Sequence, residues 1–237
     1  MKETKINSIS DNITKLVNNS NDTFKSCSVL GSLQFLTNAL NSDFQNRNKR
    51  TKFSTYNRGR IIKVNFGLNI GAELSGPHYA LVLTKNDNPY SQKITVIPFT
   101  SKPGTNHLKV NFNLSKELIS YLALNHYNAV SYDNESNFDI FIPLIARYDF
   151  PSTYHPVDTT RKINLSSKDK EKVFNNIFKL TNKMKSINYL KLDNIATVSK
   201  FRIIRPTSKL DPLNNLSVYP DYLKDIDKKI SFYLLDQ

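Results

Sequence analysis

The 237-residue chain has one cysteine, no tryptophan, only six glycines and no apolar run of membrane-spanning length. The single cysteine, Cys27, excludes an intrachain disulfide and a zinc site built from cysteines. It lies among apolar positions of an expected helix, where a buried thiol is a commoner role than a nucleophile. The N-terminus has no apolar segment typical of a signal peptide, so we expect a cytoplasmic protein that does not bind a membrane.

Carboxylates are also scarce. Asp and Glu number 20 against 33 Lys and Arg, which gives a formal net charge of +13. A surplus of this size favours a polyanionic partner, and nucleic acid is the first candidate. The alternative is a lysine-rich solvated surface, which an AT-rich genome also produces through its codons.

The amino-terminal part has helical periodicity. Within residues 5–44, apolar residues recur at steps of three and four, first up to Val17 and again from Val29. A polar run at 18–22 separates the two stripes. We therefore expect residues 1–45 to form a helical extension of two helices with no strand between them, able to pack on the main domain, on a second copy or on another protein.

Composition changes after this extension. No carboxylate occurs between Asp43 and Glu73, whereas seven Lys and Arg residues lie in that interval. Residues 46–57 are predicted to form a basic polar linker, and the main domain to span residues 58–237.

The main domain begins with strand patterns. Residues 61–66, 79–83 and 94–100 are rich in β-branched and apolar residues, and residues 108–114 are a fourth candidate strand. Glycine, proline and serine mark the loop at 71–77 and the turn at 101–104. Short strands with tight connections predict a small antiparallel barrel.

The remainder is expected to be mixed. Patterns predict helices at 115–125 and 166–185, a strand at 138–148, further strands at 195–199 and 201–204, and a final helix along the apolar face from Tyr222 to Tyr233.

Two blocks of sequence resemble the PemK/MazF family of toxins. The first contains RGRIIKVNFG, NIGAELSGPHYALVL and KITVIPFTSK in order, within residues 58–102. The second is DNIATVSKFRIIRPTSKL near the C-terminus. His78 stands where the family commonly has arginine, and Arg60 where it has an acidic residue.

The resemblance implies a fold and a function. The fold would be α+β, a small antiparallel SH3-like β-barrel with a C-terminal helix, here with an insertion around 105–190. The activity would be that of a toxin in a toxin–antitoxin system: metal-independent cleavage of single-stranded RNA, such as messenger RNA, by the RNA's own 2′-hydroxyl. It also implies a homodimer and a cognate antitoxin protein, with DNA contacted only through that antitoxin.

Cleavage through a 2′-hydroxyl needs a base, an acid and a group that stabilises the phosphorane. His78, in the resembling loop, is the first candidate for the proton transfers because imidazole titrates near neutral pH. Thr100 and Ser101 end a strand in the same block, and we expect their hydroxyl groups to donate to phosphate. These three residues form the predicted catalytic set.

The predicted RNA-binding set contains five further residues: Arg58, Glu73, Ser75, Gly76 and Arg202. Guanidinium groups donate two parallel hydrogen bonds to phosphate, which suits Arg58 and Arg202. Glu73 is a candidate acceptor from a base edge, or a partner for an arginine. The histidines lack ligand-like spacing, so no metal site and no cofactor is expected.

Two alternatives of another class stay open. The first is a non-catalytic toxin on the same barrel, such as a binder that poisons a protein like gyrase. The second is a barrel that binds RNA or DNA without cleaving it.

Overall fold

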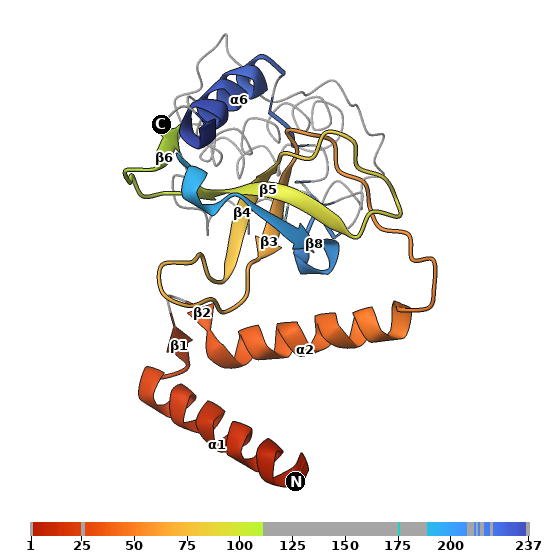
Figure 1. Ribbon diagram of the computed structural model, residues 1–237, viewed down its shortest axis with the longest axis vertical. Helices are drawn as coiled ribbons and strands as arrows, with labels where there is room; N and C mark the ends of the chain where they lie inside the picture. The colour runs from red at the N-terminus through yellow and green to blue at the C-terminus, as the bar shows by residue number, and fades with distance from the viewer. Residues whose placement is uncertain are drawn as a thin grey trace, which may run out of the picture.

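The computed structural model describes residues 2–24, 27–110, 175, 189–207, 211, 213, 216–218 and 220–235. In this part of the chain, an antiparallel sheet lies between a C-terminal helix at one end and two N-terminal helices at the other (Figure 1). The expected helices at 115–125 and 166–185 and the strand at 138–148 lie outside the described residues, apart from Asn175, which is helical.

The N-terminal helices are α1 (Lys2–Ser20) and α2 (Val29–Asn46). Contrary to expectation, two short strands, β1 (Thr23–Phe24) and β2 (Cys27–Ser28), pair between them. The reason is local hydrogen bonding. Asp22 has a positive φ of 57° and turns the chain, and its carboxylate accepts from the Leu30 amide at 2.9 Å and from the Ser28 hydroxyl at 2.8 Å. These bonds start α2, whose N-cap is Ser28.

Seven described strands form the main sheet, all paired antiparallel in the order β6-β7-β5-β4-β3-β9, with β8 paired to β5. In chain order they are β3 (Ile61–Asn65), β4 (Pro77–Val82), β5 (Lys93–Thr100), β6 (His107–Lys109), β7 (Tyr189–Lys191), β8 (Ala196–Ser199) and β9 (Ile203–Arg205). The strands expected at 61–66, 79–83 and 94–100 are confirmed within two residues. The fourth, expected at 108–114, is found at His107–Lys109 and has ended by Val110, and residues 111–114 lie outside the described residues.

The strand expected at 201–204 is wrong in its first half. Residues Lys200–Arg202 form the 3₁₀ helix η2, and only then does β9 begin. The chain changes neighbours here, since β8 pairs with β5 whereas β9 pairs with β3. An uninterrupted strand could not reach both partners. A second 3₁₀ helix, η1 (Leu192–Asn194), separates β7 from β8, which pair with successive parts of the same strand, β5.

Both faces of the sheet bury apolar side chains, because strand residues alternate between the faces. On one face Ile61, Leu81 and Phe99 pack with residues of the C-terminal helix α6 (Pro220–Leu235). On the other, Ile62, Ala80 and Val96 form a second cluster. The expected final helix is confirmed, and it covers the first cluster.

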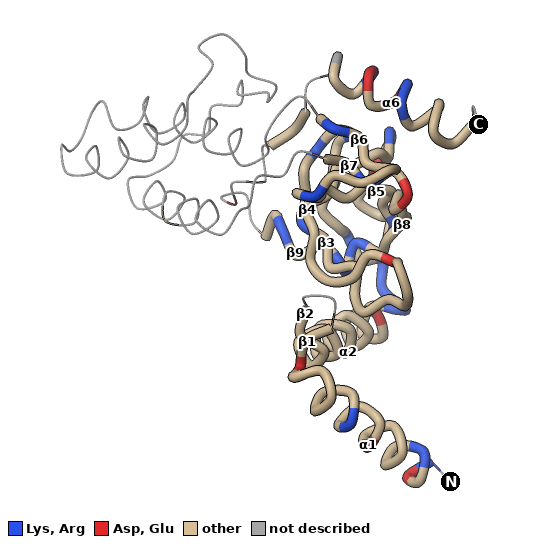
Figure 2. The backbone as a smooth tube through the Cα atoms, turned by 90° about the vertical axis from the view of Figure 1, so that its left-hand side faces the viewer, with Lys and Arg blue, Asp and Glu red and all other residues tan. Residues whose placement is uncertain are grey.

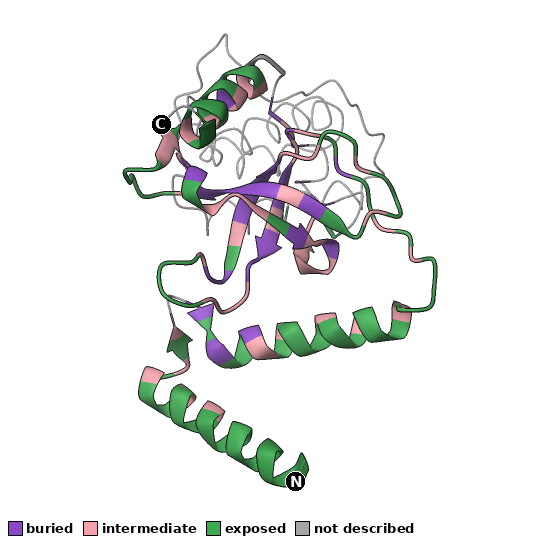
Figure 3. Cartoon of the chain, viewed as in Figure 1, coloured by how far each residue is buried: buried purple, intermediate pink, exposed green. Residues whose placement is uncertain are grey.

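The N-terminal helices contribute little to either cluster. No residue of α1 is buried, and α2 buries only Val29 and Ser32 (Figure 3). Contact with the core is made at Cys27, near the turn at Gly76, where an added Cβ would lie 3.0 Å from the Cys27 Cβ, and between α2 and η2. The two helices are therefore an appendage with exposed apolar stripes.

The expected linker 46–57 is packed in its second half. The Phe53 amide donates to the Pro89 carbonyl at 2.7 Å, and the Phe53 ring meets Phe201 edge-on at 5.1 Å. Tyr56 is buried in the second cluster. The core domain thus begins near Phe53, a few residues before the boundary expected at residue 58.

Candidate functional site

His78 lies near the start of β4, opposite Val64 of β3. Its side chain is half-buried; Nε2 lies 3.1 Å from the Ser75 carbonyl, and the Phe66 ring approaches it edge-on at 6.2 Å. Strand, loop and aromatic ring together hold the imidazole in one orientation.

Burial lowers the pKa of His78 below its ordinary value of 6.5, because desolvation disfavours the imidazolium. The positive charges of Lys191 and Lys63 lower this pKa further, whereas backbone hydrogen bonds at Ser75 and Phe99 oppose the shift. The net effect keeps His78 neutral at pH 7. A neutral imidazole accepts a proton, which suits a general base better than a fixed cation.

Thr100 ends β5, the strand that pairs with β4 through Ala80 and Pro98. Continuing this register by two residues brings Thr100 opposite His78, consistent with the contact of His78 with the Phe99 backbone. The Thr100 Oγ1 accepts from the Lys102 amide at 3.2 Å, which leaves its own proton to donate. Ser101 follows in the turn and is exposed.

The loop 67–76 carries three of the predicted residues, and they have different surroundings. Glu73 is exposed at the tip. Ser75 is buried, and its hydroxyl accepts from the Asn69 amide at 3.0 Å, so it stabilises the loop and is not presented to a ligand. Gly76 has a φ of +83° and contacts Cys27, which makes it the docking point of the N-terminal helices.

Arg202 lies beside this loop. Its Nη1 donates to the Phe66 carbonyl at 3.0 Å, and an added Cβ at Gly67 would come within 2.9 Å of that nitrogen. The guanidinium therefore binds the end of β3 and supports the loop next to His78. It is near the site, but one of its nitrogens is already used by the backbone.

Arg58 is not part of this cluster. Its guanidinium donates to the Leu83 carbonyl and to the carboxylate of Asp227 on α6. Leu83 lies beyond the far end of β4, five residues from His78, or about 17 Å along an extended strand. Arg58 joins α6 to the sheet, away from the imidazole.

Sequence reasoning missed the residues on β7. Tyr189 pairs with Thr100, and Lys191 is close enough to His78 for its charge to lower the histidine's pKa. Lys63, on β3, contributes in the same way and lies over the Tyr79 ring at 5.2 Å. More than 100 residues separate Lys191 from His78 in the chain, so no local pattern connects them.

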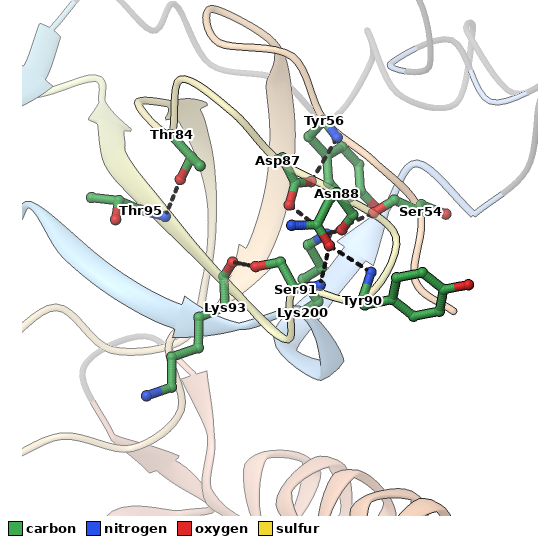
Figure 4. Close-up of polar contacts among 10 residues, drawn as sticks. All are labelled: Ser54, Tyr56, Thr84, Asp87, Asn88, Tyr90, Ser91, Lys93, Thr95 and Lys200. Atoms are coloured by element: carbon green, nitrogen blue, oxygen red, sulfur yellow. Dashed lines mark hydrogen bonds and ion pairs between the residues drawn. The ribbon is translucent and has the colours of Figure 1, made fainter. Parts of the chain in front are cut away.

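A second feature lies away from the site. Lys200 and Asp87 form an ion pair whose side chains are 2% and 1% exposed, with Nζ 2.7 Å from Oδ1 (Figure 4). Lys200 also donates to the carbonyls of Ser54 at 3.0 Å and Asn88 at 3.2 Å, and the second Asp87 oxygen accepts from the Tyr56 amide. Lys200 and Asp87 bind each other and the surrounding backbone within the core, so this pair is structural.

Among the described residues, no group of three His, Cys, Asp or Glu side chains is placed to hold a metal ion. No helix in the same ranges has the length and apolar character needed to cross a membrane. Comparisons with models of protein families and with curated proteins found no match to the chain.

Proposed function

We propose that this protein is a metal-independent endoribonuclease of the PemK/MazF toxin type, acting on single-stranded RNA in the cytoplasm. The observation that carries the proposal is the environment of His78: a half-buried imidazole, kept neutral, beside a strand-end threonine and influenced by Lys63 and Lys191. Attack of a 2′-hydroxyl on a phosphodiester requires a neutral base to take the proton and a nearby positive charge to stabilise the phosphorane.

In this mechanism His78 removes the proton from the 2′-hydroxyl, and the resulting alkoxide attacks the adjacent phosphorus. The P–O5′ bond breaks and the departing 5′-oxygen takes a proton from water, leaving a 2′,3′-cyclic phosphate and a 5′-hydroxyl end, while His78 returns its proton to solvent. Lys191, on the same face as Thr100 and Tyr189, stabilises the negative charge of the phosphorane, and the Thr100 hydroxyl donates to a phosphate oxygen. The lowered pKa of His78 favours the role of base over that of acid.

The strand arrangement supports an SH3-like barrel for the core. One edge of β5 pairs with β4, and its other edge pairs successively with β8 and β7. The 3₁₀ helices η1 and η2 interrupt the chain between β7, β8 and β9, and β9 then pairs with β3 instead of β5. Short, strongly bent antiparallel strands are typical of small barrels.

The toxin assignment includes a homodimer and a cognate antitoxin, with DNA reached only through the antitoxin. The N-terminal helices suit a protein partner because residues 1–46 contain four lysines and four carboxylates, so they carry none of the surplus positive charge. Their exposed apolar residues include Ile6 at 64% and Phe44 at 66% exposure. RNA binding is therefore proposed for the core and protein binding for the helices.

One observation favours a second candidate, a non-catalytic binder on the same core, such as a gyrase-poison-like toxin or a nucleic-acid-binding module. Backbone groups of Ser75 and Phe99 both contact the His78 ring. A histidine held in this way also serves simply to join β4 to its neighbours.

The deciding experiment is incubation of the purified protein with a long single-stranded RNA in excess EDTA, with the His78→Ala variant beside it. Discrete fragments from the wild type alone support the ribonuclease. Intact RNA with a mobility shift supports the nucleic-acid-binding module, and intact RNA without a shift supports a protein target.

A further inference from the structure

Next to the proposed site, directly paired residues of β5, β7 and β6 form one row across the three strands, called the rung residues below. Tyr189 of β7 pairs with Thr100 on one side and with Lys109 of β6 on the other. The next pair of β7 and β6 is Lys191 with His107. Directly paired residues of an antiparallel sheet project from the same face. These residues therefore share the face that carries Thr100.

The opposite face at this position is core. Phe99, Leu190 and Leu108, which alternate with the rung residues, belong to the first apolar cluster. Tyr189, Lys191 and His107 are half-buried and Lys109 is exposed, so their face meets solvent. Figure 2 shows β6 and β7 together at the end of the sheet near α6, the side opposite α1 and α2.

The chemistry of this surface is specific. It holds two lysines, a tyrosine and a histidine, and none of the paired positions on β6 and β7 carries a carboxylate. Tyr189 pairs with Thr100, and the β4–β5 register brings Thr100 opposite His78, so the surface adjoins the proposed site. From β4 to β6 it crosses four neighbouring strands, about 14 Å at the usual strand spacing.

We propose that this surface, defined by Tyr189, Lys109, Lys191 and His107 and here named the β6–β7 track, binds single-stranded RNA on one side of the scissile phosphate. Tyr189 stacks on a base and Lys109 contacts a backbone phosphate. Base stacking combined with backbone charge is the usual mode for single strands and depends little on sequence. The inference rests on the proposed function for its choice of ligand and extends it to substrate positioning.

The test measures two things separately. Affinity is measured by fluorescence anisotropy with a 2′-O-methyl RNA, which lacks the free 2′-hydroxyl and stays intact. Cleavage kinetics are measured with the unmodified RNA. The variants are Tyr189→Leu, Tyr189→Phe and Lys109→Gln. The matched control is Lys93→Gln, an exposed lysine at the opposite end of β5, paired with Ser199.

We expect Tyr189→Leu to weaken affinity about ten-fold, whereas Tyr189→Phe, which keeps the ring, stays close to wild type. Lys109→Gln should lower the slope of log affinity against log salt by about 0.7, the value for one phosphate contact on a single strand. Tyr189→Leu and Lys109→Gln should both have a raised KM and a nearly unchanged kcat. Lys93→Gln should change neither the affinity nor the kinetic constants.

Failure of the track and failure of the ribonuclease give different results. If the wild type cleaves RNA but Tyr189→Leu and Lys109→Gln bind like Lys93→Gln, the track is overturned while the ribonuclease stands. If the wild type binds RNA and the variants lose affinity as expected, but RNA is never cleaved, the RNA-binding role of the track is supported and the ribonuclease activity is overturned. Absence of any RNA binding overturns the track, and a Tyr189→Phe variant as weak as Tyr189→Leu overturns the stacking role.

Discussion

The ammonium of Lys200 lies 2.7 Å from a carboxylate oxygen of Asp87, with both side chains almost wholly buried. The contact joins the corner η2 to the loop after β4, and through Ser54 and Tyr56 it also holds the segment that follows the N-terminal helices (Figure 4). This oxygen, Asp87 Oδ1, has no hydrogen-bond partner of good geometry, so its contact with Lys200 is chiefly electrostatic.

Removal of one member of this pair should be strongly destabilising. Asp87→Asn leaves the Lys200 charge buried without compensation, which typically costs about 3–5 kcal/mol. Denaturant unfolding measures the loss, and the double variant Asp87→Leu/Lys200→Met should recover much of it. The control is Asp227→Asn, which breaks the more exposed ion pair with Arg58 and should cost about 1 kcal/mol or less. Similar losses in the two single variants would contradict the structural role of the buried pair.

His78→Ala should reduce RNA cleavage by about 10²–10⁴-fold, the usual contribution of a positioned base. His78→Gln, which cannot titrate, should be nearly as inactive.

Because burial lowers the pKa of His78, the neutral form persists as pH falls below 6.5, and the acidic limb of kcat/KM should lie below that value. His78→Arg has no such limb, and if it were as active as wild type, the position would supply charge instead of proton transfer. Thr100→Ala should slow turnover and keep the limb.

Cleavage should be unaffected by chelators and should leave 2′,3′-cyclic phosphate and 5′-hydroxyl ends, because the 2′-hydroxyl is the nucleophile in the proposed mechanism. Analysis of the products by mass spectrometry identifies the ends. RNA with a single 2′-deoxy substitution at the scissile nucleotide should bind and remain intact. A requirement for Mg²⁺, or products with 5′-phosphate ends, would contradict this mechanism.

RNA affinity should fall steeply with salt, because the net charge of +13 lies outside the neutral N-terminal helices. Titrations between low and physiological salt give the slope of log affinity against log salt. A flat response would show that the positive charge is only a solvated surface. A protein lacking residues 1–46 should have the same slope as the full chain.

A truncated protein beginning at Phe53 should remain folded and rich in β-structure, since α1 buries no residue and α2 buries only two. Circular dichroism and thermal unfolding test this. The comparison is a protein beginning at Asn57, which loses the contacts of Phe53 with Pro89 and of Ser54 with Lys200 and should unfold at lower temperature. If the protein beginning at Phe53 were insoluble, the helices would be integral to the core.

Local patterns in the sequence were sufficient for most of the described elements. Alternating β-branched residues placed β3 and β5 correctly, and apolar periodicity placed α6 and both N-terminal helices. The corner at Lys200 escaped prediction, because its cause is a change of neighbouring strand and a buried charge pair, and neither is encoded within a short window. Arg58 and Arg202 had the residue type expected of phosphate ligands, but their hydrogen bonds are made to the backbone and to Asp227.

What the sequence determined by itself was the position of His78 in a loop-to-strand transition, the basic character of the chain and the antiparallel α+β class. Those properties depend on composition and on neighbours within a few residues. Only the tertiary structure brought Lys191 and Tyr189 beside His78 and Thr100 and placed Arg58 at the far end of β4. Strand register decides these distances, and register arises from pairing between segments remote in the chain, where the burial of both faces of the sheet admits a single alignment.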